Sequence, residues 1–363
     1  MENLVIVGAG QAGLAMSYEL QRAGVAHVVL DAHARIGDNW RTRWKSLRLF
    51  SPAEYNNLPG WDFPAPKGHI PAKDEAADYL EAYAARFSLP VRSGVRVTQL
   101  QKTGSGFQLS TSEGPLPTQR VVVATGPFNV PAVPALAEAL PADIPQMHTR
   151  AYRDPGSLAS GPVMVVGAGA SGSQIAREVA GTGRKTYLAG RDPGSFPRRI
   201  LGRDIYWWFY RTGVIRMRWD SWLGRRVFKH RDRGDALIGE RLKDIVAEAG
   251  LIHKPKLTAY AEGGFRFADG SAVDDIESVI WATGYQQKFD WIALDIFGED
   301  GRPRHSRGVV AEAPGLYFIG LKTLYRANSS SMGGVGEDAH YLAGVIAARG
   351  QHGRAETLAQ SQK

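Results

Sequence analysis

Two groups of glycine residues with the spacing G-x-G-x-x-G are the part of this sequence best suited to bind a cofactor. In such a turn the first glycine permits a tight bend, the second lets the backbone approach a pyrophosphate, and the third lets helix and strand pack closely. The free N–H groups of the following helix then bind the anion. The residues predicted to contact dinucleotides at the two turns are Gly8, Gly10, Gln11, Ala12 and Gly13, and Gly167, Gly169, Ala170, Ser171 and Gly172.

The residue that follows the second strand of each unit differs in charge. Asp31 lies 23 residues after Gly8, whereas Arg191 lies 24 residues after Gly167. A carboxylate at this place accepts hydrogen bonds from ribose hydroxyls, and an Arg accommodates a 2′-phosphate. Two such modules in one chain usually bring a flavin and a nicotinamide together for hydride transfer. We therefore expect FAD in the first turn and NADPH in the second, with NADH as an alternative donor because Asp192 would repel the same phosphate.

Apolar runs and helical patterns surround both turns in the order strand, turn, helix, strand. This order predicts an α/β fold with two Rossmann-type dinucleotide-binding domains, in which an NAD(P)H domain is inserted into the FAD domain. Helical spacing also predicts helices over 72–87 and 237–249. The predicted boundaries are 1–157 for the first part of the FAD domain, 158–282 for the NAD(P)H domain and 283–363 for the second part of the FAD domain.

The composition excludes several other classes of protein. The 363 residues suffice for two or three domains. Because the chain has no Cys, it has no disulfide, thiolate metal site, iron–sulfur cluster or cysteine nucleophile. No metal-ligand spacing and no Ser-His-Asp set is found either. The first apolar run is too short for a secretory signal, and no stretch is long enough for a transmembrane span, so the expected location is cytoplasmic.

One basic, aromatic segment stands out. Residues 191–233 contain twelve Lys or Arg and four Asp, an excess of eight that equals the net charge of the whole chain. Four Trp lie in the same segment, which is predicted to form an insert at about 195–235. Such a segment can bind nucleic acid or a membrane surface. The favoured interpretation is an aromatic wall with a solvated basic outer face, because charge alone is a weak predictor of partners.

Within this insert, the aromatic run 206–210 predicts either a helix packed on a cleft or an entrance for an apolar substrate. No nucleic-acid partner is expected. Weak contact with a membrane surface and a homodimer remain open alternatives.

Motifs along most of the chain resemble the class B flavin-containing monooxygenases, in particular short bacterial members near the YUCCA-type group. The matching segments are 37–41, 43–49, 121–126, 279–285, 316–320 and 333–338. The resemblance gives no certain catalytic residue, and its candidates are Trp40, Ser46 and Tyr285. His148, in the linker, is the histidine to test first. The cofactor contacts that the resemblance adds are Asn39, Trp40, Ser46, Thr125, Gly126, Thr283, Gly284, Gly320 and Gly334.

The resemblance implies an NADPH-dependent monooxygenase in which reduced FAD reacts with O2 to form a C4a-(hydro)peroxyflavin. One oxygen atom would enter a small apolar organic substrate, by thioether or amine oxidation or by Baeyer–Villiger oxidation of a ketone. The alternative is a reductase or oxidase that passes electrons from NAD(P)H through the flavin to a quinone, to ferredoxin or to oxygen without oxygenating a substrate. A non-catalytic flavin sensor would show no sustained NADPH turnover.

Overall fold

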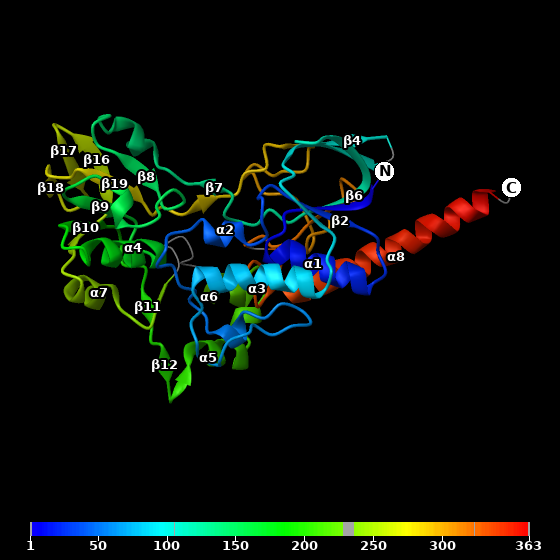
Figure 1. The fold of residues 1–363 in the computed structure, drawn as a ribbon, viewed down its shortest axis with the longest axis horizontal. Helices are drawn as coiled ribbons and strands as arrows, with labels where there is room; N and C mark the ends of the chain where they lie inside the picture. The colour runs from blue at the N-terminus through cyan, green and yellow to red at the C-terminus, as the bar shows by residue number, and fades with distance from the viewer. Residues whose placement is uncertain (1, 105, 228–235, 323, 362–363) are drawn as a thin grey trace.

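The computed structural model, which describes residues 2–104, 106–227, 236–322 and 324–361, contains two large sheets that lie side by side (Figure 1). Four smaller sheets of two or three strands accompany them in the described part of the chain, among them the antiparallel sheet β16-β17-β18. Each large sheet is built around a glycine turn of the predicted kind. Long α8 (Val335–Ser361) extends outward from the first unit (Figure 1). No helix in the described part of the chain has the length and apolar character needed to cross a bilayer.

The first sheet combines a parallel core with an antiparallel extension. Its strand order is β21-β4-β5-β6-β1-β2-β3, and β22 pairs with β6. The apolar end of β6 pairs in parallel with both β1 and β22, so that Val121 lies between Val5 and Leu316. The strands are β1 (Glu2–Val7), β2 (Val28–Asp31), β3 (Val91–Ser93), β4 (Val97–Thr103), β5 (Gly106–Thr111), β6 (Gly114–Val123), β21 (Ile292–Ala293) and β22 (Leu316–Phe318).

Helices from both ends of the chain cover this sheet. The buried faces of α1, α3 and α8 share one hydrophobic core. The predicted helix over 72–87 is confirmed as α3, whose Ala76, Leu80, Tyr83 and Ala84 are buried at helical spacing. The helices are α1 (Gln11–Arg22), α2 (Asp38–Arg41), α3 (Lys73–Arg86) and α8, with a 3-10 turn η1 (Ala53–Tyr55).

The second sheet is parallel throughout, in the order β15-β10-β9-β19-β8. Strand β8 pairs with β19 in this sheet, so residues 146–148 belong to the second unit and not, as the sequence predicts, to the first. The elements are β8 (Gln146–His148), η3 (Pro155–Ser157), β9 (Val163–Val166), α4 (Ala170–Ala180), β10 (Thr186–Ala189), α7 (Leu242–Glu248), β15 (Ile252–Lys254), β16 (Leu257–Ala261), β17 (Gly264–Phe267), β18 (Ala272–Val273) and β19 (Ser278–Trp281).

Two connections join the units, and they pair with each other. On the way out lie β7 (Val130–Pro131) and η2 (Ala135–Ala139), and on the way back lies β20 (Tyr285–Gln286). Strands β7 and β20 are antiparallel. The Thr283 hydroxyl donates to the Ala132 carbonyl at 2.5 Å. The junction between the units is therefore a pair of hydrogen-bonded strands.

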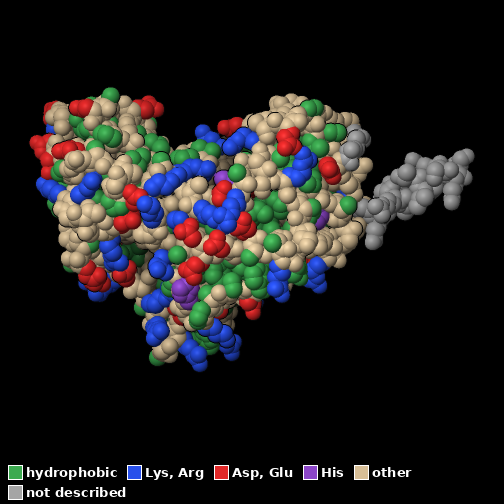
Figure 2. Space-filling model, in the orientation of Figure 1, with side chains coloured by type: hydrophobic (Ala, Val, Ile, Leu, Met, Phe, Trp, Pro, Cys, Tyr) green, Lys and Arg blue, Asp and Glu red, His purple; other side chains and the backbone are tan. Residues whose placement is uncertain are grey.

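The basic insert leaves the second unit and returns to it. Its described elements are β11 (Ser195–Phe196), β12 (Arg199–Ile200), β13 (Arg203–Asp204), α5 (Ile205–Arg211), η4 (Val214–Arg216), α6 (Trp222–Val227) and β14 (Leu237–Ile238). The aromatic run forms α5, as predicted. The prediction of one helix over 237–249 is wrong at its start, because Leu237 pairs with Ser195 in β14 and helix α7 begins only at Leu242. Figure 2 shows basic side chains around apolar ones at the lower end of the molecule, where Figure 1 places β12 and α5.

Candidate active site

The first glycine turn has the geometry that a bound pyrophosphate requires. Gly8 has φ +109°, and a Cβ there would lie 2.8 Å from the Ala124 carbonyl oxygen. A Cβ on Gly13 would lie 1.8 Å from the Gly8 carbonyl oxygen. Around Gly10, in contrast, no heavy atom of another described part of the chain lies within 4 Å of the Cβ position. The outer glycines thus permit close packing, and the middle glycine faces open space.

The second turn repeats this geometry. Gly167 has φ +115°, with its Cβ position 2.3 Å from the Ala282 carbonyl oxygen. The Cβ position of Gly172 is 1.7 Å from the Gly167 carbonyl oxygen, and that of Gly169 again has no neighbour within 4 Å. The first and third glycines of the two turns therefore permit the same close backbone packing in the two units.

Each turn leads directly into a helix whose N-terminus is free to bind an anion. Among the described residues, no side chain caps α1 at Gly10 or α4 at Gly169. The first-turn N–H groups of both helices, on Gln11 and Ala12 and on Ala170 and Ser171, are those that a helix cannot satisfy internally. Together with the open space at the middle glycines, they fit the pyrophosphate of a dinucleotide. We call each turn, its helix N-terminus and its following acidic or basic residue the first and the second cradle.

Asp31 is built into the first cradle. Its Oδ2 accepts the Ala9 N–H at 2.6 Å, and its Oδ1 accepts the His33 N–H and faces His33 Nδ1, both at 2.8 Å. Burial alone would raise the pKa of Asp31, but these hydrogen bonds outweigh it and hold the pKa below its ordinary value. A carboxylate has about four acceptor positions, so capacity remains for a ribose hydroxyl.

Arg191 is held much less firmly in the second cradle. It is exposed, and no hydrogen bond or ion pair within the described part of the chain involves its side chain. Asp192, which could repel a phosphate, turns its Oδ1 to the Gly194 N–H at 2.8 Å. The guanidinium of Arg191 is thus available for an anion arriving from solvent.

The two A-T-G segments lie where the chain leaves each sheet. Gly126 and Gly284 have φ of +72° and +80°, and neither Cβ position has a neighbour within 4 Å. The Thr125 hydroxyl is buried without a hydrogen-bond partner among the described residues, whereas Thr283 fastens the two connections. Thr125 therefore has a free polar atom for a ligand, and Thr283 has a structural contact.

Trp40 lies between the two units. It packs against the cores of both, and its Nε1 is buried without a partner among the described residues. The neighbouring Trp44 and Leu47 are buried in the core of the second unit. Ser46, between them in the sequence, is exposed. Its contact with FAD therefore stays a prediction that rests on the resemblance alone.

A cluster at the junction was not predicted as a unit from the sequence. Arg43 hydrogen-bonds through Nη1 to the Tyr285 hydroxyl, and its Cζ lies 5.1 Å from the centre of that ring. On the other side of the guanidinium, Nη2 donates to Asn39 Oδ1 at 3.3 Å. The His148 ring meets the Tyr285 ring edge-on, with centroids 4.9 Å apart. Contacts between the segment around α2, the end of β8 and the return connection at β20 thus hold the two units together.

The contacts of His148 determine its protonation. Its Nε2 lies 2.8 Å from the Gly284 carbonyl oxygen, which can only accept, and its Nδ1 lies 3.1 Å from the Arg150 N–H, which can only donate. Burial lowers the pKa of His148, and the nearby charges of Arg43 and Arg150 lower it further against the hydrogen bond to Gly284. His148 is therefore neutral with the proton on Nε2.

The segment before α8 reaches the start of α1 through Gly320. A Cβ on Gly320 would lie 2.6 Å from Ala12 Cβ, and one on Gly334 would lie 2.0 Å from the Asn328 carbonyl oxygen, so both glycines permit close packing. Asn328 Oδ1 and Asp338 Oδ2 are buried and have no partner among the described residues. Burial raises the pKa of Asp338 despite the charge of Arg307. The sequence analysis includes Asp338 in the matching segment 333–338 but names neither side chain as a cofactor contact, because an acceptor without a partner is visible only in three dimensions.

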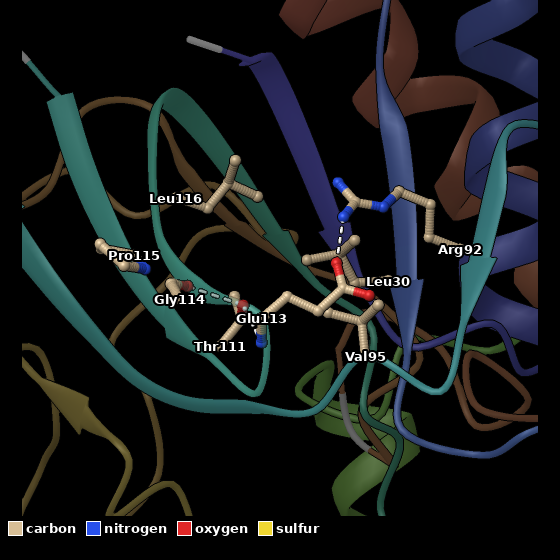
Figure 3. A pocket seen from close by; sticks show the side chains of 8 residues that line it. All are labelled: Leu30, Arg92, Val95, Thr111, Glu113, Gly114, Pro115 and Leu116. Carbon is tan, nitrogen blue, oxygen red and sulfur yellow. Dashed lines mark hydrogen bonds and ion pairs between the residues drawn. The ribbon is translucent and has the colours of Figure 1, made fainter.

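Of two small cavities in the described part of the chain, the first lies away from the predicted cofactor residues and the second adjoins the second cradle. The first, of about 90 Å³, lies between the ends of β2 and β3 and the hairpin of β5 and β6, where Arg92 and Glu113 form an ion pair (Figure 3). It has room for about three waters, and none of the predicted cofactor residues lines it. A second, of about 70 Å³, lies beside the first turns of α4 and is lined by Ala170 and by Gln174, whose Oε1 is buried without a described partner.

Two cradles in two Rossmann-type units, joined by paired connections, define a two-dinucleotide-binding oxidoreductase. Residues 5–199 match the pyridine nucleotide-disulphide oxidoreductase family, and the chain belongs to that family. Since it has no Cys, it lacks the redox disulphide of the family's name. The resemblance to class B flavin monooxygenases is confirmed by the relatives and solved structures that follow.

These relatives span nearly the whole chain. An uncharacterized CzcO-like oxidoreductase of Geobacillus kaustophilus is 40% identical over 342 residues, covering 94% of this chain and 97% of that protein. The indole-3-pyruvate monooxygenase YUCCA4 of Oryza sativa subsp. japonica is 29% identical over 390 residues, covering 95% and 87%. The structure of a flavin-containing monooxygenase from Stenotrophomonas maltophilia is 27% identical, with a TM-score of 0.78, and covers 96% of this chain and 98% of its own.

Proposed function

We propose that this oxidoreductase is an FAD-dependent monooxygenase that uses NADPH as its electron donor. FAD binds in the first cradle and NADPH in the second. In the overall reaction, substrate, O2, NADPH and a proton give the oxygenated substrate, NADP⁺ and water. The observation that carries the proposal is the pair of equivalent turns followed by opposite charges, Asp31 and Arg191, in a chain without Cys.

The first cradle suits a cofactor that stays bound. Asp31 is ordered by three hydrogen bonds before any ligand arrives. In this proposal the flavin meets buried polar atoms without described partners on Trp40, Thr125, Asn328 and Asp338, which offer one donor, one hydroxyl and two acceptors. The other carboxylate oxygen of Asp338 pairs with Arg307 at 3.4 Å. A flavin dinucleotide carries both N–H and O–H donors and carbonyl acceptors that match such a set, and unmatched buried groups of this kind are otherwise costly.

The chain's own residues orient the two cofactors and keep water out. Bound FAD supplies the redox chemistry, accepting a hydride and activating dioxygen. Trp40, packed against both cores, excludes solvent from the junction. His148 holds its proton on Nε2 for the Gly284 carbonyl and so fixes the turn that precedes Tyr285. Arg43 fastens that tyrosine from the flavin side. These contacts fix the distance between the cradles.

The substrate is proposed to be a small, mainly apolar molecule. Helix α5 brings an aromatic surface from the insert to the first unit, where Tyr206 and Tyr210 stack on Tyr55 with centroids 5.7 and 5.0 Å apart. The Tyr210 hydroxyl donates to the Gly333 carbonyl at 3.4 Å, just before α8 begins. Aromatic surface next to a few polar groups is typical of sites for apolar ligands.

The test is a product balance. The purified protein would be given NADPH and O2 with a panel of one thioether, one tertiary amine, one ketone and one 2-oxo acid, the last because YUCCA relatives act on indole-3-pyruvate. We expect oxygenated product from at least one member, in proportion to the NADPH consumed. If all electrons are instead recovered as hydrogen peroxide, or as reduced quinone when a quinone is added, the chain is a reductase or oxidase and the proposal is wrong.

A further inference from the structure

Exposed apolar side chains gather in the insert. Of the eight large apolar side chains that are exposed in the described part of the chain, five belong to residues 195–227. Leu201 is 85% exposed and Trp222 is 78% exposed. The remaining three of these five side chains belong to Phe196, Ile200 and Leu223. Single exposed apolar residues need no explanation, but such a concentration marks an interaction surface. We call residues 195–227 the basic lobe.

The tip of the β12–β13 hairpin places a Leu in a backbone conformation that Leu rarely adopts. In the backbone ladder Arg199 lies opposite Asp204, and Ile200 lies opposite Arg203. Leu201 and Gly202 are left as a two-residue loop. Both loop residues have positive φ, +48° and +72°. A loop of this kind favours Asn-Gly, because Asn tolerates the left-handed conformation far better than Leu. A strained Leu that is 85% exposed at a hairpin tip gains little from packing within the chain, so we infer that it serves an external contact.

The charge of the lobe identifies the partner. Residues 195–227 contain eight Arg and two Asp, a net charge of +6. Three of the Arg have ion pairs, with Asp204, Glu337 and Asp220. The other five are exposed and have no ion pair with a described residue, and they are Arg199, Arg203, Arg211, Arg225 and Arg226. At the lower end of the molecule, where Figure 1 places β12 and α5, Figure 2 shows basic side chains around apolar ones.

We propose that the basic lobe docks on an anionic lipid surface, with Leu201 and Ile200 at the hairpin tip entering the bilayer and the unpaired Arg side chains contacting lipid phosphates. This inference does not depend on the proposed reaction. A second copy of the chain is a poor partner, because two faces of +6 repel each other. Exposed Trp222 and Phe196 could stack on bases or lie at a lipid interface. Lipid is favoured because Leu201, the most exposed apolar side chain, and Ile200 beside it at the tip are aliphatic and suit hydrocarbon.

The test is co-sedimentation of the full-length, FAD-loaded protein with lipid vesicles. The vesicles would contain about 30% phosphatidylglycerol in phosphatidylcholine, with pure phosphatidylcholine as the reference. We expect binding only to the anionic vesicles, and much weaker binding when the salt rises from about 0.1 to 0.5 M. Leu201→Asn should weaken vesicle binding at least tenfold, roughly the value of burying one Leu side chain. Its Tm should stay equal or rise, since Asn suits the turn.

Matched variants separate lipid docking from simple loss of charge or of apolar surface. Arg199→Gln should weaken binding about fivefold, whereas Lys102→Gln, which removes an exposed charge on β4, should not. Val133→Asn, which like Leu201→Asn replaces an exposed apolar side chain by a neutral one but lies outside the lobe, should also leave binding unchanged. The proposal is overturned if the wild type ignores anionic vesicles or if Leu201→Asn binds them normally. It is equally overturned if that variant changes only self-association, or if duplex DNA binds as tightly as the vesicles and binds the variant equally.

Discussion

The two cradles share their backbone but differ in how firmly the charged residue is held. The Cβ positions of Gly13 and Gly172 lie 1.8 and 1.7 Å from the carbonyl oxygens of the first glycines, so the turns are nearly equivalent. Asp31, however, is hydrogen-bonded to the turn itself through the Ala9 N–H. Arg191 is exposed and unpaired within the described structure.

This difference corresponds to two kinds of ligand. A preorganised site loses little conformational entropy on binding and releases its ligand slowly, whereas an exposed, unpaired side chain must be ordered each time a ligand arrives. The first cradle is therefore suited to a group that remains bound through many turnovers. The second is suited to a co-substrate that binds and leaves in every cycle, and the predictions below test this contrast.

The largest effects on the stability of the fold should follow substitution of the third glycine. In Gly13→Ala and Gly172→Ala the new methyl group would meet backbone oxygen, which no rotamer can avoid, so we expect the free energy of unfolding to fall by about 1–3 kcal/mol. Urea denaturation measures this. Gly344→Ala, in α8 with no atom within 4 Å of its Cβ position, is the matched control and should stabilise by about 0.5–1 kcal/mol. Normal stability of both turn variants would contradict the tight-turn geometry.

Substitution of the middle glycines should impair ligand binding in one cradle at a time, without unfolding either unit. Gly10 and Gly169 have φ of −77° and −71° in extended backbone, so Val fits locally but fills the space for the pyrophosphate. Gly10→Val should yield a folded protein without flavin absorbance. Gly169→Val should stay yellow and bind NADPH at least about 100-fold more weakly, a change of about 2.7 kcal/mol. Loss of flavin in both variants would show that the cradles are not separate sites.

Much of this contrast could be predicted from the sequence because it is local. The spacing of three glycines determines the steric conditions of a turn whatever the rest of the fold does, and Asp31 and Arg191 follow their strands at a set distance. Helix α3 was predictable for the same reason, since its buried residues repeat at helical spacing.

The wrong helix start at Leu237 and the unpredicted junction cluster both depend on contacts between segments that are distant in the sequence. Leu237 joins a strand with Ser195, and that contact overrides a helical pattern. The junction cluster joins Arg43 to Tyr285, 242 residues away. No local pattern encodes such contacts. Residues 228–235 of the predicted insert lie outside the described structure.

An intermediate effect is expected at the charged residue of the second cradle. Arg191→Ala removes a charge-assisted hydrogen bond to a 2′-phosphate, worth about 1.5–3 kcal/mol. The KM for NADPH should rise about tenfold or more, while the KM for NADH stays nearly unchanged. Steady-state kinetics with both donors measures the split, and Asp192→Asn, whose carboxylate faces the Gly194 N–H, is the control that keeps the guanidinium. An equal loss with NADPH and NADH would show that the 2′-phosphate binds elsewhere.

The smallest effect should come from His33, the residue that makes the first cradle sensitive to pH. The hydrogen bond to Asp31 raises the pKa of His33 above its ordinary value, with the charges of Asp31 and Asp38 adding to it and burial and Arg150 opposing it. Because this pKa is raised in the folded protein, the stabilisation is complete below about pH 6.5. It is lost as the pH rises through the raised value.

At the acidic end the lowered pKa of Asp31 acts in the opposite sense, so the pair also weakens as the pH falls through that lowered value. Flavin release should therefore accelerate above neutral pH in the wild type. In His33→Gln this pH dependence should disappear, at a cost below about 1 kcal/mol because the imidazole is partly exposed. Flavin fluorescence on dilution measures release. NADPH affinity should not change, because His33 belongs to the first cradle alone, and a variant that loses NADPH as readily as flavin would mean that the two cradles are coupled through this residue.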